Sequence, residues 1–194
     1  MYELFRTYLN KITSATISDE EFQFFQAAFS VKKVKKKQFL LHEGGICRYM
    51  AFIVKGAMRQ YTIDDKGIEH IARFGIEEWW MSDRESLISL TPSRYNIDAI
   101  EDCDLLVATN EKLILLREQS PLFVKLGQVL DEKSYITSQK RIDVTISYTA
   151  EEKVVYLMEN HSQFLHRFPQ NMLASYLGLS PETLSRVRKQ LLQK

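Results

Sequence analysis

The sequence contains only two cysteines among its 194 residues, Cys47 and Cys103. They are too few and too far apart in the chain to form a zinc knuckle or to hold an iron–sulfur cluster. We therefore expect two reduced thiols with structural roles, and we expect no metal site.

Long apolar runs are also absent. No segment approaches the roughly 18 consecutive apolar residues of a membrane-spanning helix. Residues 1–18 are amphipathic and carry charges throughout, without the apolar centre of a signal peptide. With 45% hydrophobic and 26% charged residues, the composition is that of a globular protein. These features predict a cytoplasmic protein with no membrane partner.

Catalytic motifs are equally scarce. The four histidines are scattered along the chain, and neither G-x-S-x-G nor H-E-x-x-H occurs. His161 and His166 are five residues apart, a spacing that does not place both on one side of a helix. We predict that the protein is not an enzyme and has no catalytic residues.

The carboxy-terminal segment, residues 168–192, reads FPQNMLASYLGLSPETLSRVRKQLL. Its residue sizes predict two short helices across a tight turn, in which Ala174 keeps the first helix thin and Gly178 supplies a positive φ. The residues expected to close the small core are Leu173, Leu177, Leu184 and Val187. This is the pattern of a helix-turn-helix, which lays its second helix in the major groove of DNA.

The second of these helices is predicted to begin at a Ser180 cap followed by Pro181. Several of its polar side chains avoid the apolar stripe, and Arg186 is the first candidate for base contact. The predicted DNA-binding residues are Ser180, Glu182, Thr183, Ser185, Arg186 and Lys189. An ordinary α-hairpin with a solvated cationic face is the alternative interpretation.

Charge supports the DNA-binding hypothesis locally. The formal net charge of the whole chain is only +1. Residues 161–194 nevertheless carry a single acid, Glu182, against five basic residues: Arg167, Arg186, Arg188, Lys189 and Lys194.

The first two thirds of the chain read differently. Helical spacing in residues 2–9 and 20–29 gives way after Val31 to short segments rich in branched and aromatic residues. Strands are predicted at 38–41, 49–54, 57–63, 68–74, 95–100 and 104–109, with turns at Gly44-Gly45, Lys55-Gly56 and residues 64–67. The lysine-rich run of residues 31–37 favours the solvated start of a first strand over a nucleic-acid patch. These short strands and turns predict an antiparallel β-sandwich or barrel.

Helical spacing returns at residues 111–118 and then, after Pro121, over residues 122–148. The first half of this long helix is the better candidate for a dimer seam, because Lys133, Lys140 and Asp143 interrupt a strict coiled-coil pattern. Thr149 and Glu152 then form a capping box that starts the carboxy-terminal domain. We predict a β-roll sensor domain at 1–120, a long helix at 121–148 and a helix-turn-helix domain at 149–194.

Three segments carry a resemblance to a known family: FLLHEG at 39–44, YMAFIVKGAMR at 49–59, and LGLSPETLSR at 177–186. They resemble the β-roll turns and the recognition helix of the Crp/Fnr family of bacterial transcription regulators. The resemblance covers nearly the whole chain. It implies an α+β fold with an antiparallel β-roll, which is a jelly-roll-like double-stranded β-helix. It also implies a long dimerisation helix, a homodimer and a palindromic DNA operator.

The family resemblance also implies an effector pocket. Arg94 matches the arginine that holds a cyclic phosphate in relatives, Asp83 lies near the expected ribose-binding acid, and Thr137 and Ser138 lie where the long helix touches the purine. The remaining candidates are Trp80 and Tyr95. Because Tyr95 stands where relatives carry a small residue, we expect it to hinder cyclic AMP and other cyclic nucleotides, and the small-molecule effector stays unidentified.

Two further departures concern DNA. The sequence ends with the recognition helix where many relatives append a β-hairpin wing, which predicts a shallower salt dependence. Pro181 replaces an arginine that reads guanine in many relatives, so a different operator is expected. The leading hypothesis is a DNA-binding regulator with a β-roll sensor; the alternative is a cyclic-nucleotide-binding protein that acts on a protein partner.

Overall fold

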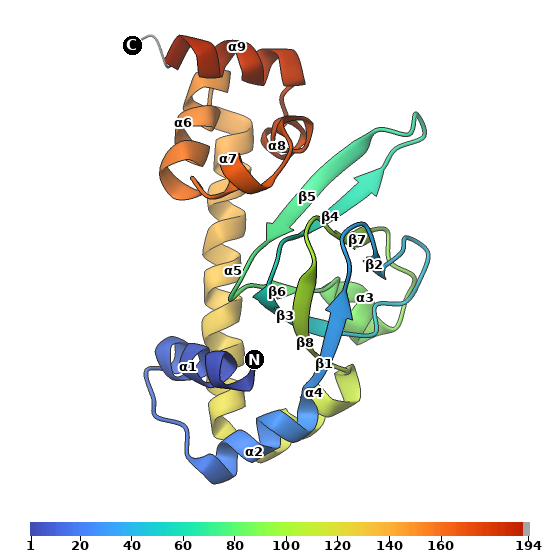
Figure 1. Ribbon diagram of the computed structural model, residues 1–194, viewed down its shortest axis with the longest axis vertical. Helices are drawn as coiled ribbons and strands as arrows, with labels where there is room; N and C mark the ends of the chain where they lie inside the picture. Colours follow the sequence, from blue (N-terminus) through green and yellow to red (C-terminus); the bar gives the residue numbers. More distant parts are fainter. Residues whose placement is uncertain (192–194) are drawn as a thin grey trace. The chain divides into compact units, whose positions relative to one another are not determined.

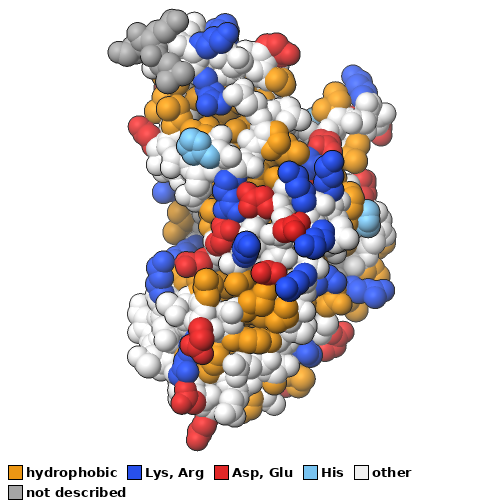
Figure 2. All heavy atoms as spheres, in the orientation of Figure 1, with side chains coloured by type: hydrophobic (Ala, Val, Ile, Leu, Met, Phe, Trp, Pro, Cys, Tyr) orange, Lys and Arg blue, Asp and Glu red, His pale blue; other side chains and the backbone are white. Residues whose placement is uncertain are grey.

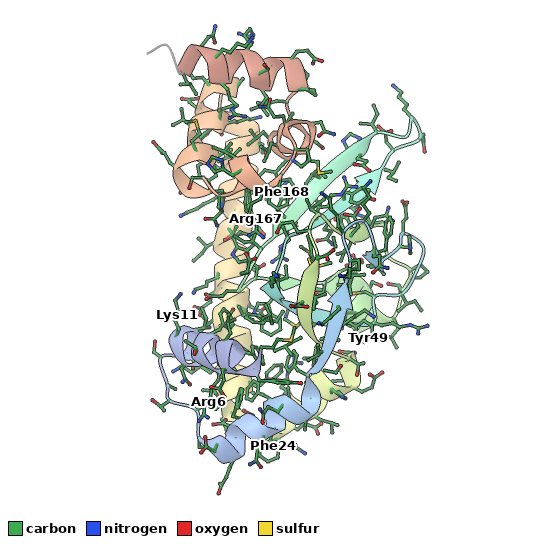
Figure 3. The ribbon with its side chains drawn as sticks, in the orientation of Figure 1. Arg6, Lys11, Phe24, Tyr49, Arg167 and Phe168 are labelled. Carbon is green, nitrogen blue, oxygen red and sulfur yellow. The ribbon has the colours of Figure 1, made fainter. Side chains whose placement is uncertain are left out.

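The amino-terminal helices form where the apolar spacing predicts them, as α1 (Tyr2–Thr13) and α2 (Asp19–Ala28). Ser18 caps α2 by accepting a hydrogen bond from the backbone N–H of Glu21. Arg6, labelled in Figure 3, ties the two helices together. Its guanidinium pairs with Asp19 at 2.6 Å and donates to the carbonyl of Ile17 at 2.9 Å.

The computed structural model describes residues 1–191 (Figure 1). The last three residues, including Lys194 of the basic segment, lie outside the described residues. The chain separates into two compact units. The first comprises Met1–Thr62 and Phe74–Lys133, and the second Ile63–Arg73 and Ser134–Lys194. The long helix, which the sequence predicts to be a separate segment, is thus divided between the two units.

The β-roll consists of two four-stranded sheets with strand orders β1-β8-β3-β6 and β2-β7-β4-β5. Every registered strand pair in these sheets is antiparallel, as predicted. The strands are β1 (Ser30–Val34), β2 (Phe39–Leu41), β3 (Met50–Lys55), β4 (Met58–Ile63), β5 (Glu69–Gly75), β6 (Trp80–Met81), β7 (Asn96–Ala99) and β8 (Cys103–Ala108). Residues 31–34 of the lysine-rich run lie in the mostly exposed strand β1, which precedes the first predicted strand, and Lys35, Lys36 and Lys37 lie between β1 and β2.

An aromatic cluster fills the core between the amino-terminal helices and the β-roll. Phe5 lies 4.9 Å from Phe52 and 5.9 Å from Trp80, measured between ring centroids. The indole N–H of Trp80 donates to the hydroxyl of Tyr8 at 2.8 Å, so this polar atom is buried with its partner. Cys47 and Cys103 are buried and not joined to each other.

Helices connect the roll to the carboxy-terminal domain. A short helix, α3 (Arg84–Ser89), interrupts the strands, and α4 (Asn110–Gln119) and α5 (Pro121–Ser147) follow them. The predicted capping box is present, because Thr149 and Glu152 bond reciprocally at the start of α6 (Ala150–Asn160). The remaining helices are α7 (Phe164–Arg167), α8 (Gln170–Leu177) and α9 (Pro181–Leu191).

Candidate nucleic-acid interface and effector site

The helix-turn-helix forms as the sequence predicts. Gly178 ends α8 in the left-handed region, with φ 66° and ψ 36°, and the chain reverses into α9. Helix α9 packs on both α6 and α8. The four predicted core residues, Leu173, Leu177, Leu184 and Val187, are all buried, and so is Ala174. A rigid support therefore holds α9 by its apolar stripe and leaves the opposite side of the helix to solvent.

The beginning of α9 is capped by Ser180. Its hydroxyl oxygen accepts from the backbone N–H of Thr183, and the two hydroxyl groups lie 3.2 Å apart. The backbone N–H of Glu182 and the Ser180 hydroxyl hold the pKa of the Glu182 carboxyl below its ordinary value. Ser180 and Thr183, both predicted to bind DNA, thus have their hydroxyls engaged in the cap.

The other predicted DNA-binding residues line one solvent-facing hollow on α9, which we call the recognition face. It consists of Pro181, Glu182, Ser185, Arg186, Lys189 and Gln190. Arg186 and Lys189 are exposed, and within residues 1–191 neither forms a hydrogen bond or an ion pair. Figure 2 shows blue basic side chains at the top of the view, where Figure 1 draws α9, together with red acidic atoms. Gln190 was not predicted, although it lies four residues after Arg186 on the same side of the helix.

The tip of the β4–β5 hairpin belongs to the same unit as the helix-turn-helix, and Ser175 of α8 bonds to its edge. The Ser175 hydroxyl donates to the carbonyl of Glu69 and accepts from the backbone N–H of Ile71, both at 2.9 Å. Arg141 of α5 donates to the carbonyls of Ala72 and Ile71 and lies 4.1 Å from the centre of the Tyr176 ring. These bonds satisfy backbone groups on the edge strand β5.

Ser175→Ala removes both hydroxyl bonds to the hairpin. We expect the free energy of unfolding to fall by about 1–2 kcal/mol, because two backbone groups lose their partner. Hydrogen exchange at the amide of Ile71 should become roughly tenfold faster. Ser162→Ala, at an exposed serine in the same unit, serves as the control and should change neither quantity. Unchanged exchange at Ile71 would show that the hairpin does not depend on this bond.

The predicted effector residues Asp83 and Arg94 lie in different surroundings. Asp83 is buried, caps α3 by accepting from the backbone N–H of Ser86, and accepts from the Ser93 hydroxyl at 2.6 Å. Arg94 is exposed and stacks on Tyr95, with its guanidinium 5.0 Å from the ring centre and bonded to the Tyr95 hydroxyl at 3.0 Å. This bond raises the pKa of Arg94. The geometry gives Arg94 a side-chain partner in place of a ligand phosphate.

The remaining predicted effector residues do not lie beside Asp83 or Arg94. Trp80 packs in the aromatic core, while Thr137 and Ser138 are exposed on the part of α5 that belongs to the second unit. Within the first unit, Ser93 links Asp83 to Tyr95, because its hydroxyl donates to Asp83 at 2.6 Å and accepts from the backbone N–H of Tyr95 at 2.9 Å. Arg94 in turn bonds to the Tyr95 hydroxyl.

A buried ion pair inside the β-roll was not predicted. Arg59 on β4 and Asp98 on β7 form two hydrogen bonds, at 2.8 and 3.0 Å, and their side chains are each 8% exposed. The guanidinium of Arg59 also lies 4.0 Å from the ring centre of Tyr61. The two residues are 39 positions apart, and only the β4–β7 register, which pairs Arg59 with Asp98, brings them together.

Two negative findings apply to the described part of the chain. No group of three or more histidine, cysteine, aspartate or glutamate side chains there could hold a metal ion. None of its helices has the length and apolar character needed to cross a membrane.

Known proteins are similar to this chain in sequence, both in the β-roll and over most of its length. Residues 31–120 match the cyclic nucleotide-binding domain. The transcriptional activator protein Anr of Pseudomonas aeruginosa is 25% identical over 169 residues, which cover 80% of this chain and 68% of Anr.

Solved structures share the fold. FixK2 from Bradyrhizobium japonicum superposes with a TM-score of 0.72 and 21% identity, covering 85% of each chain. The c-di-GMP-responsive global regulator CLP of Xanthomonas campestris gives a TM-score of 0.69 with 15% identity, covering 91% of this chain and 92% of CLP.

One chain thus combines a β-roll that matches the cyclic nucleotide-binding domain with a helix-turn-helix, the arrangement of regulators in which a sensor domain is joined to a DNA-binding domain. These comparisons support the resemblance to the Crp/Fnr family of transcription regulators that the sequence motifs carry.

Proposed function

We propose that this protein regulates transcription by binding a palindromic DNA operator as a homodimer, with α9 as the recognition helix. The recognition face carries the proposal. Arg186 and Lys189 stand clear of the helix-turn-helix core and are available to base edges and phosphates. Arg186 can form a bidentate contact with guanine, and Glu182 and Ser185 can accept or donate at neighbouring bases.

The second half of α5, rather than the first half that the sequence favours, supports a dimer. Four large apolar side chains there are more than half exposed: Tyr135 at 67%, Ile136 at 53%, Ile142 at 52% and Ile146 at 78%. Tyr135, Ile142 and Ile146 follow an i, i+7, i+11 spacing, which places them along one side of the helix. A second copy packed along this stripe would remove the apolar surface from water and present two recognition helices.

DNA binding is tested with the full chain and a fluorescent duplex of random sequence. Because phosphate contacts release counterions, the logarithm of the affinity should fall linearly with the logarithm of salt concentration. Lys189→Ala should weaken binding to every duplex and flatten the salt slope by about one unit. A protein that binds no duplex even at low salt would contradict the proposal.

The alternative function, a cyclic-nucleotide-binding protein that acts on a protein partner, has less support. The guanidinium of Arg94 is bonded to Tyr95, and the buried carboxylate of Asp83 would repel an anionic phosphate. Calorimetric titration with cyclic AMP and cyclic GMP distinguishes the two functions. Binding that disappears in Arg94→Ala, together with no affinity for DNA, would favour the alternative.

A further inference from the structure

An apolar pocket lies within the first unit, away from the residues assigned above to DNA or to a cyclic nucleotide, apart from Trp80. Its volume is about 360 Å³, and it is enclosed by α3, α4 and the first half of α5. Trp80, Leu113 and Phe123 contribute buried apolar surface to its lining, and Ile88 and Ile114 are exposed around it. We call it the α3–α5 pocket. Its volume and lining are those of small-molecule sites in proteins.

The charges that line the pocket sum to one positive charge. Its ionisable residues are Arg84, Arg117 and Asp131. Arg84 and Asp131 neutralise each other through a bidentate ion pair that joins α3 to α5. Arg117 on α4 is exposed, and no acid among residues 1–191 lies within ion-pair distance of it. One guanidinium is therefore available beside an apolar cavity.

Gly127 gives a second, independent indication of a ligand. It lies inside α5, where glycine weakens a helix relative to alanine. Apart from its chain neighbours and the backbone of its own helix, a Cβ atom built at this position would meet no atom within 4 Å, so close packing inside the unit does not require glycine. Gly127 is also one of the residues that line the pocket. Its lack of a side chain leaves room for a ligand against the helix backbone.

We propose that the α3–α5 pocket binds an apolar carboxylate, a small acid with an alkyl or aryl body and one negative charge. The apolar body lies against Trp80 and Phe123, and the carboxylate pairs with Arg117. The role of the pocket as an effector site rests on the regulatory function proposed above. Binding of the carboxylate to the pocket does not, because it is measured without DNA. Helix α5 lines the pocket and also carries the stripe assigned to the dimer, which gives the ligand a route to influence the recognition helices.

The test compares three probes with the same ten-carbon chain: decanoate, decanol and decyltrimethylammonium. Each is titrated into the full chain below its micellar concentration and followed by calorimetry and tryptophan fluorescence. We expect decanoate to bind at least roughly tenfold more tightly than either of the other probes. Arg117→Gln should weaken decanoate binding about tenfold, while the charge-retaining Arg117→Lys should weaken it less than about threefold.

Gly127→Leu is the second variant, because leucine favours a helix and its side chain fills the pocket. Decanoate binding should fall by more than roughly 30-fold while helix content and DNA affinity without decanoate stay unchanged. Equal binding of the three probes, or unchanged decanoate binding in Gly127→Leu, would overturn the proposal. A Gly127→Leu protein that sediments as a monomer where the parent is a dimer would also overturn it, since a second copy would then occupy the pocket. If the unsubstituted protein binds no DNA, that result would instead count against the regulatory function.

Discussion

Arg186→Ala should lower the affinity for a selected operator by about 1–3 kcal/mol, which corresponds to roughly 5- to 150-fold. The guanidinium lies on the recognition face, where it can donate two parallel hydrogen bonds to one guanine. Alanine removes these bonds, so discrimination at that base pair should relax while other positions stay specific. Anisotropy titrations with the operator and with single-base variants measure both effects.

Arg188→Ala is the matched control for this prediction. Arg188 lies on the same helix and carries the same charge, but it is half-buried and outside the recognition face. Its loss removes only a general electrostatic attraction, so affinity should fall equally for every sequence. Equal loss of base discrimination in the two variants would remove Arg186 from the proposed reading role.

Asp98→Ala should lower the free energy of unfolding by about 3–5 kcal/mol, because it removes the Asp98 carboxylate, and two hydrogen bonds, from a buried guanidinium. Both side chains are 8% exposed, so water does not replace the lost partner without opening the β-roll. Urea denaturation followed by circular dichroism measures the change.

Asp102→Ala provides the comparison for the buried pair. Asp102 pairs with Lys35 at 2.8 Å, but these side chains are 59% and 69% exposed. An exposed ion pair contributes about 0–1 kcal/mol, and we expect a loss in that range. If Asp98→Ala costs no more than Asp102→Ala, the β-roll does not depend on its internal ion pair.

Local sequence patterns predicted much of the fold, because the interactions that set them span only a few residues. Thr149 and Glu152 are three positions apart and cap α6 as expected, and Gly178 adopts the positive φ that the turn requires. The two-residue strand β6 and the helix α3 were not predicted separately. Strand β6 is too short for periodicity, and the cap of α3 depends on a buried carboxylate, Asp83, that also binds Ser93.

The candidate functional sites were predicted less completely than the fold, because several of their contacts join residues far apart in the sequence. The recognition face follows from helical periodicity, so four of the six predicted DNA-binding residues share one surface. Ser175 and Glu69 are 106 positions apart in the chain, so no local sequence pattern predicts their hydrogen bond. The family resemblance predicted Arg94 as a phosphate-binding residue. It did not predict that Arg94 stacks on Tyr95, because this contact depends on the conformations of the two side chains.

In the proposed dimer, two copies of α9 read one DNA duplex. Selecting binding sites from a random duplex library with the full chain tests this arrangement. We predict enrichment of a palindrome whose half-sites lie about 10–10.5 base pairs apart, centre to centre, bound by two protein chains per duplex. Recovery of no enriched sequence, or of a single asymmetric site occupied by one chain, would contradict it.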